Sequence, residues 1–154
     1  MTEPMEAIVI VHLLAACVWV GGSVALVFAG VPAIRVLEGE PRGRAMKELG
    51  LRWRPIGYSA LLVLGVTGVA LAAHDWSEGR SPFKTVLWIK VALSIALVVA
   101  SYLHNYVYGP RLQDEIREGR PTRSRPTLVA VGWISLALTI TVPILGAILA
   151  DLAG

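Results

Sequence analysis

Four long apolar runs constrain the fold of this chain more than any other feature of its sequence. They cover roughly residues 7–34, 56–73, 85–108 and 127–150. Each has about the 20 residues that a helix, rising about 1.5 Å per residue, needs to cross a hydrocarbon layer of about 30 Å. Backbone polar groups in lipid must be satisfied within the spanning segment, which favours helices. The sequence therefore predicts an all-α integral membrane four-helix bundle, with residues 1–154 forming a single transmembrane domain.

The composition favours a membrane protein over a soluble one. Hydrophobic residues make up 55% of the chain and charged residues 16%, whereas a soluble domain carries about 25% charged residues. The charges fall almost entirely between the runs, so the runs have almost none of the polar face of soluble-bundle helices. The residues before the first run include Glu3 and Glu6 but no lysine or arginine. We therefore do not expect a cleaved secretory signal, which begins with positive residues.

The basic residues predict the orientation of the bundle. Most of them lie in two loops: Arg35, Arg42, Arg44, Lys47, Arg52 and Arg54 after the first run, and Arg111, Arg117, Arg120, Arg123 and Arg125 after the third. The loop after the second run holds only Arg80 and Lys84. Because basic short loops stay in the cytoplasm, we expect a multi-pass protein with both termini extracytoplasmic. The net charge of +3 fits contact with anionic lipid headgroups in the bilayer, and nothing indicates nucleic acid.

Ionisable residues inside the apolar runs are functional candidates, because they are costly to place in a membrane. Counted from the outward-facing ends of their runs, His12 and Lys90 both lie about six residues, or roughly 9 Å, deep. His74, Asp75 and Asp151 mark the outer ends of the second and fourth runs. We expect these five residues to converge in the outward-facing half of the bundle.

His104 is predicted to belong elsewhere. It lies 14 residues after Lys90, or about 21 Å further along the helix axis, near the cytoplasmic face. His12 and His104 are therefore not expected to bind the same metal or haem iron within one protomer, although a haem shared between protomers would escape this argument. His12 with His74 is the one workable bis-histidine pair, provided that His74 dips inward. Trp19 lies seven residues after His12, on the same helix face.

Several other residues have predicted structural roles. We expect close helix approach at Gly21, Gly22, Gly65 and Gly68. We expect interfacial anchoring by Trp53, Trp76, Trp88 and Trp133. Residues 42–52 are predicted to form a short, separate interfacial helix.

Three motifs resemble the copper resistance protein D family. HLLAACVWVGG (12–22) resembles the opening of that family, and RPIGYSALLVLGVTG (54–68) resembles its arginine-led helix ending in Thr-Gly. SPFKTVLWIKVAL (81–93) resembles its loop followed by a lysine-bearing helix. The resemblance covers roughly residues 8–108, a four-helix core of a family whose full-length members are often larger. It implies copper handling at the extracytoplasmic side of the bacterial inner membrane. Imidazole suits copper, so His12 and His74 are the candidate metal ligands.

The layout is also similar to that of the bacterial oxygen-independent protoporphyrinogen oxidases, which have a histidine in helix one and a lysine in helix three. That resemblance implies haem b, with His12 as axial ligand and Lys90 pairing with a propionate or acting as a catalytic proton-transfer group. Trp19 and His104 are further candidate cofactor contacts. A third interpretation is a non-catalytic accessory subunit, in which Lys90 pairs with Asp75 or Asp151. Enzymatic activity, a homo-oligomer and a partner membrane subunit stay open.

Overall fold

The structure, a computed structural model, describes residues 3–76 and 81–153, so Arg80 lies outside the described residues. Its elements in order are α1 (Glu3–Ala25), η1 (Leu26–Gly30), α2 (Val31–Arg35), α3 (Gly39–Asp75), α4 (Ser81–Tyr102), η2 (Leu103–Tyr108), α5 (Gly109–Arg117) and α6 (Ser124–Ala153). The elements η1 and η2 are π-helical turns. The predicted all-α fold is confirmed.

Four continuous helical stretches are long and apolar enough to cross a membrane. They are Glu3–Arg35, Gly39–Asp75, Pro82–Arg117 and Ser124–Leu152. Large apolar side chains lie on their outer surface; Leu62 is 69% exposed and Val69 is 71% exposed. Such a surface is unfavourable in water and is compatible with a hydrocarbon surrounding. The chain therefore forms a four-pass membrane bundle.

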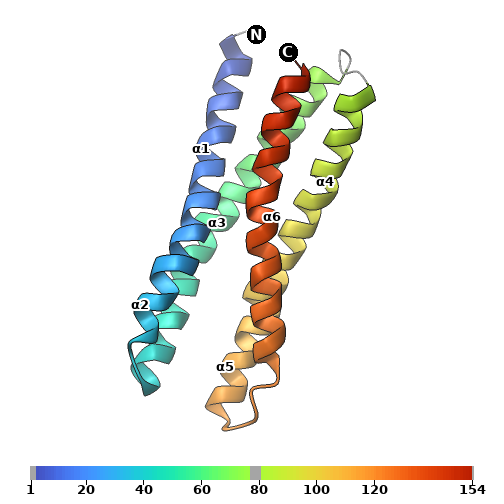
Figure 1. Ribbon diagram of the computed structural model, residues 1–154. Helices are drawn as coiled ribbons and strands as arrows, with labels where there is room; N and C mark the ends of the chain where they lie inside the picture. Colours follow the sequence, from blue (N-terminus) through green and yellow to red (C-terminus); the bar gives the residue numbers. More distant parts are fainter. Residues whose placement is uncertain (1–2, 77–80, 154) are drawn as a thin grey trace.

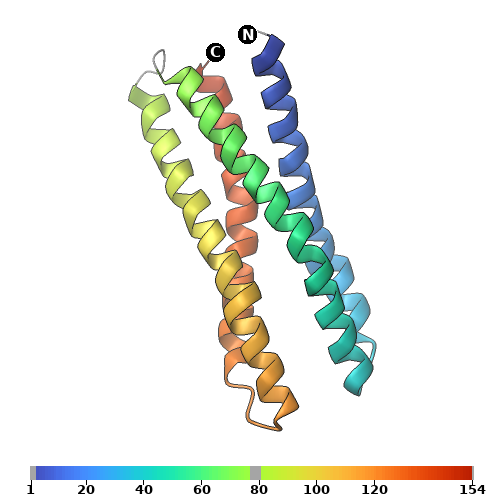
Figure 2. The same ribbon diagram turned by 180° about the vertical axis from the view of Figure 1, so that it is seen from behind.

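The helices associate as two pairs, which meet where α1 contacts α6. α1 packs along α3, and α4 packs along α6. Seen from both sides, α3 crosses obliquely from beside α2 at one end to beside α4 at the other (Figures 1 and 2). Both termini lie at one end of the bundle, which we call the terminal end. The turns that join α2 to α3 and α5 to α6 lie at the other, arginine-rich end, which we call the basic end.

The core of the bundle is small. Trp19, Ala60 and Leu97 are its buried centre, and Trp53 packs against them. The rings of Trp19 and Trp53 are 6.1 Å apart. Trp53 is therefore partly buried between α1 and α3, whereas Trp76, Trp88 and Trp133 are exposed, as expected of anchors at the membrane interface.

The helices extend further than the apolar runs. Residues 42–52 belong to the continuous helix α3, so the predicted separate interfacial helix is wrong. A helix has no reason to end at the membrane surface when charged residues with good helix propensity, such as Lys47 and Glu48, continue the chain. α5 likewise carries the third span past its apolar residues.

Prolines account for the two π-helical turns. Pro32 and Pro110 each follow a π-helical turn by two residues. A proline inside a continuing helix offers no N–H and clashes with the carbonyl four residues earlier. Widening the preceding turn to the i+5 pattern relieves the clash, and π-helical turns of this kind occur often at functional sites.

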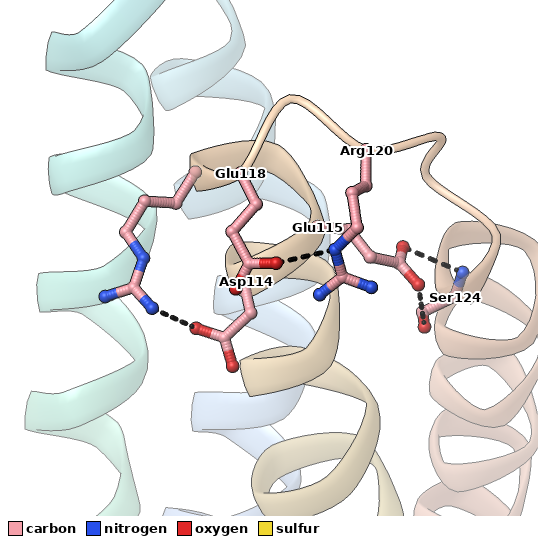
Figure 3. A network of polar contacts seen from close by, with 6 residues as sticks. Asp114, Glu115, Glu118, Arg120 and Ser124 are labelled. Carbon is pink, nitrogen blue, oxygen red and sulfur yellow. Dashed lines mark hydrogen bonds and ion pairs between the residues drawn. The ribbon is translucent and has the colours of Figure 1, made fainter.

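A carboxylate caps the start of α6 at the basic end. Glu115 accepts hydrogen bonds from the Ser124 backbone N–H (3.0 Å) and from the Ser124 hydroxyl (2.8 Å). Arg120 pairs with Glu118 in the same turn, as Figure 3 shows. Both Ser124 donors, the backbone N–H first, lower the pKa of Glu115 from its ordinary value. α5 lies beyond the apolar run, so this network belongs to the water-facing turn.

Glu115→Gln is expected to lower the melting temperature at neutral pH, because a neutral amide is a weaker acceptor. Glu115 has a folded-state pKa below its ordinary value of 4.5. Its stabilising contribution is therefore complete above that value and is lost as the pH falls through the folded-state pKa. Thermal unfolding in detergent, from neutral to acid pH, checks whether the difference in melting temperature between the wild type and Glu115→Gln disappears at acid pH. Glu118→Gln, at an exposed pair, is the control with a small effect; a gap of constant size would contradict the prediction.

Candidate functional site

His12 on α1 is held by a threonine on α3. The Nδ1 atom of His12 lies 2.7 Å from the Thr67 hydroxyl oxygen. The Thr67 hydroxyl donates its proton to the Val63 carbonyl at 2.6 Å. Because a hydroxyl has only one proton, Thr67 must accept from His12, which places the imidazole proton on Nδ1. The unprotonated lone pair of His12 is then on Nε2, free to bind a metal or a proton.

A glycine lies next to this imidazole. A Cβ at Gly68 would stand 3.5 Å from Cε1 of His12, in ordinary van der Waals contact. The Thr-Gly pair at the end of the quoted α3 motif thus contacts His12 with both residues. The sequence indicated Gly68 as a small-residue contact but gave Thr67 no role as a partner of His12.

Lys90 on α4 reaches the same region. Its charge lies close enough to act on the imidazole of His12. A Cβ at Gly146 on α6 would stand 3.1 Å from Nζ of Lys90, so the amine lies against the bare backbone of α6. Lys90 therefore lies within electrostatic range of His12 in the half of the bundle nearest the terminal end, the terminal half. We call His12, Thr67 and Lys90 the His12 cluster.

The acidic residues proposed as partners of Lys90 lie elsewhere. Asp75 contacts Nδ1 of His74 at 2.7 Å, in a pair that is partly exposed. Within residues 3–76 and 81–153, Lys90 forms no ion pair with Asp75 or Asp151. The ammonium group of Lys90 thus enters the membrane interior without a neutralising carboxylate among the described residues.

His74 does not join His12. It follows Thr67 by seven residues, about 10 Å along the axis of α3, and its ring is engaged by Asp75. In the described part of the chain, no group of three or more His, Cys, Asp or Glu side chains is arranged to hold a metal ion. The structure therefore offers His12 as a single imidazole ligand and keeps His74 at the surface.

Trp19 is part of the packing centre. Its indole N–H donates to the Thr139 hydroxyl at 3.1 Å, and the side chain is 6% exposed. A Cβ at Gly57 would stand 3.0 Å from the Trp19 ring. The helix face that Trp19 shares with His12 thus points into the bundle, and Trp19 lies about 10 Å further along α1 than His12.

His104 lies apart from these residues, on η2. It belongs to the half of the bundle nearest the basic end, which we call the basic half. Its Nδ1 atom is 3.2 Å from the Leu128 carbonyl oxygen. Since a carbonyl can only accept, Nδ1 carries the proton and Nε2 is again unprotonated. A Cβ at Gly132 would stand 3.0 Å from Cε1 of His104. His12 and His104 therefore occupy opposite halves of the bundle, as the axial count predicted.

Not every predicted small-residue contact forms. A Cβ at Gly22 would overlap the Trp53 ring, whereas Gly21 and Gly65 have no neighbouring atom within 4 Å of their Cβ positions. The expectation of close approach at Gly21 and Gly65 is therefore wrong within this chain. Two further glycines that admit a polar side chain, Gly132 and Gly146, lie on α6. The only sequence signal for them was their position in the fourth apolar run.

No protein family model, curated protein or solved structure matches this chain. The fold and the membrane character therefore rest on the helices themselves. The chain is a multi-pass integral membrane protein with four candidate spans; its hydrogen-bonded imidazoles include His12 in the terminal half and His104 in the basic half.

Proposed function

We propose that this protein binds haem b in the terminal half of the bundle, where Nε2 of His12 would hold the iron. The observation that carries the proposal is the hydrogen-bond chain from His12 to Thr67 to Val63. Histidine ligands of metals almost always donate their second ring N–H to a fixed acceptor, which sets the tautomer and raises the basicity of the ligating nitrogen. His12 has that arrangement before any metal is bound.

The surrounding residues support a tetrapyrrole. Gly68 and Gly146 make room for the side chains of His12 and Lys90, and small helix faces of this kind would let a flat macrocycle approach them. Lys90 has no acidic partner among the described residues. A haem propionate would neutralise it, which would offset the cost of an ammonium group in the membrane.

The residues of the chain have distinct roles in this proposal. Haem, when bound, supplies one-electron redox chemistry. Thr67 fixes the tautomer and orientation of His12. Lys90 binds the anionic edge of the macrocycle or holds a proton at Nζ beside it. This division of roles serves an oxidoreductase or an electron-transfer protein equally.

Copper handling is the second candidate. The observation that favours it is that His12 and His74 lie in the same half of the bundle, each with an imidazole, a ligand type that suits copper. Copper would require His74 to approach His12 across about 10 Å of helix axis. Haem does not require this movement, so we place it first.

We also infer that the terminal half faces the extracytoplasmic side of a bacterial inner membrane. The two arginine-rich turns lie together at the basic end (Figure 1), and such short basic segments remain in the cytoplasm. The His12 cluster would then be reached from the extracytoplasmic side.

A visible spectrum with a metal analysis tests the proposal. The protein is expressed in the membrane of haem-producing bacteria and purified in a mild detergent. A Soret band with stoichiometric iron is the expected result. Stoichiometric copper without a Soret band would replace haem by the second candidate. A colourless protein without either metal, still colourless after incubation with haemin or copper salts, would reject both and favour an accessory subunit.

A further inference from the structure

A second polar cluster lies in the basic half, between α3 and η2. Arg54 and Tyr58 are four residues apart on α3, so they share one face of the helix. That face meets η2, where Asn105 and Tyr106 lie. We call these four residues the Arg54 cluster. None of them belongs to the proposed haem site, which lies in the other half of the bundle.

The π-helical turn explains why Arg54 is held there. The N–H of Gly109 donates to the His104 carbonyl, in the i+5 pattern. The next residue is Pro110, which has no N–H. The Asn105 carbonyl therefore has no backbone donor from either residue, and the Nη2 atom of Arg54 donates to it instead. One N–H group of the guanidinium thus takes the place of the missing backbone donor to the Asn105 carbonyl.

The cluster also contains two donors without acceptors. The Nε atom of Arg54 and the hydroxyl of Tyr58 are buried and have no hydrogen-bond partner in the part of the chain that the structure describes. The Asn105 side chain lies near the Tyr58 hydroxyl, but its amide donates to the Ser101 carbonyl. Buried donors of this kind cost free energy unless an acceptor reaches them.

The positive charge of Arg54 is not neutralised either. None of the ion pairs among the described residues includes Arg54. The Tyr106 ring covers the guanidinium, with 4.7 Å between the ring centroid and Cζ of Arg54. Tyr106 also packs on Tyr58 and stacks on Tyr102. A cation–π contact attracts the charge but provides no hydrogen-bond acceptor for Nε.

The depth of the Arg54 cluster in the bilayer indicates which kind of hydrogen-bond acceptor is available to it. Arg54 lies two residues before the second apolar run, and Tyr106 lies near the end of the third. Both therefore lie at the level where lipid headgroups meet the hydrocarbon layer. Tyr102 is 54% exposed and Tyr106 is 44% exposed on the lipid-facing side. A phosphate at this level can reach the cluster from the surrounding leaflet, with acyl chains alongside the two tyrosines.

We propose that the Arg54 cluster is a binding site for the phosphate group of an anionic phospholipid. The phosphate accepts from Nε of Arg54 and from the hydroxyl of Tyr58, and it neutralises the guanidinium. Entry requires the exposed Tyr106 ring to move aside, while the Nη2 bond to the Asn105 carbonyl stays in place. An anionic lipid is favoured over a zwitterionic one because the latter brings its own cation.

Lipid retention by native mass spectrometry tests the site. The wild type and the variants are extracted from bilayers of equal parts phosphatidylcholine and phosphatidylglycerol. The wild type is expected to retain phosphatidylglycerol preferentially. Tyr58→Phe keeps the ring packing and the Arg54 bond to Asn105, and it is expected to lower phosphatidylglycerol affinity about tenfold. Arg52→Gln, an exposed arginine two residues from Arg54 and paired with Glu48, is the matched control and is expected to behave as the wild type.

Two outcomes would overturn the proposal. Undiminished phosphatidylglycerol retention by Tyr58→Phe would reject the site. Displacement of the lipid by inorganic phosphate would show that the site takes free phosphate and would reject the lipid assignment. Arg54→Gln alone is not decisive, because it also removes the bond to Asn105. Its helicity by circular dichroism separates misfolding from loss of the ligand.

Discussion

Gly22→Ala is expected to lower the free energy of unfolding by about 3 kcal/mol, the upper end of the usual cost of overpacking a core. A Cβ at Gly22 would stand 2.0 Å from one Trp53 ring atom and 2.3 Å from the next. The indole cannot easily retreat, because it packs against Trp19. Its far edge also lies within 3.1 Å of the Cβ position of Gly57. The pair α1/α3 would have to separate where it is most tightly packed.

Gly21→Ala supplies the matched control, one residue away on the same helix. Its Cβ would meet no atom within 4 Å, so the variant should melt as the wild type does, or slightly higher because alanine favours helix. Combining Gly22→Ala with Trp53→Leu should restore part of the loss by removing the opposing ring. Thermal unfolding in detergent measures all three. Equal melting temperatures for Gly21→Ala and Gly22→Ala would show that α1 and α3 do not pack as described.

The contrast between these two glycines shows what the sequence can predict. Run lengths determined the number of helices and the axial depth of each residue, because rise per residue is constant. They did not determine which way a residue faces. Neighbouring residues point about 100° apart, so Gly21 and Gly22 cannot both face α3, and the sequence alone did not choose between them.

The candidate site was predictable to the same extent. The axial depth of each residue predicts that His12 and Lys90 lie at one level and that His104 lies apart from them. It did not identify Thr67 as the partner of His12, because that contact depends on the rotation of α3 about its axis and on its oblique crossing. Depth likewise predicts that Trp53 stands near a run end, but the rotation of α3 about its axis directs its ring towards Trp19.

The Arg54 cluster could not be predicted from the sequence, for another reason. Arg54 was counted as one of several basic residues that set orientation. Its specific partner is a backbone carbonyl exposed by the combination of an i+5 turn and Pro110. Pro110 is visible in the sequence, but the carbonyl that it leaves without a donor belongs to the main chain and carries no side-chain signal.

His12→Ala is expected to abolish cofactor binding, whereas Thr67→Val is expected to weaken it about 10- to 100-fold. Valine preserves the shape of threonine but cannot accept from Nδ1 of His12, so the imidazole loses its fixed tautomer while keeping its position. Haemin titration followed at the Soret band, or copper titration if copper is the metal found, measures both variants. The graded loss is the signature of a ligand and its orienting partner.

Thr141→Val is the control for the threonine substitution. The Thr141 hydroxyl makes the same bond to its own helix, donating to Ala137, but it is exposed. Thr141→Val should therefore leave cofactor affinity unchanged. Binding that survives His12→Ala would transfer the ligand role to another residue, and His104, the other imidazole with an unprotonated Nε2, would be the first to substitute. Equal effects of Thr67→Val and Thr141→Val would mean that the bond between His12 and Thr67 does not orient the ligand.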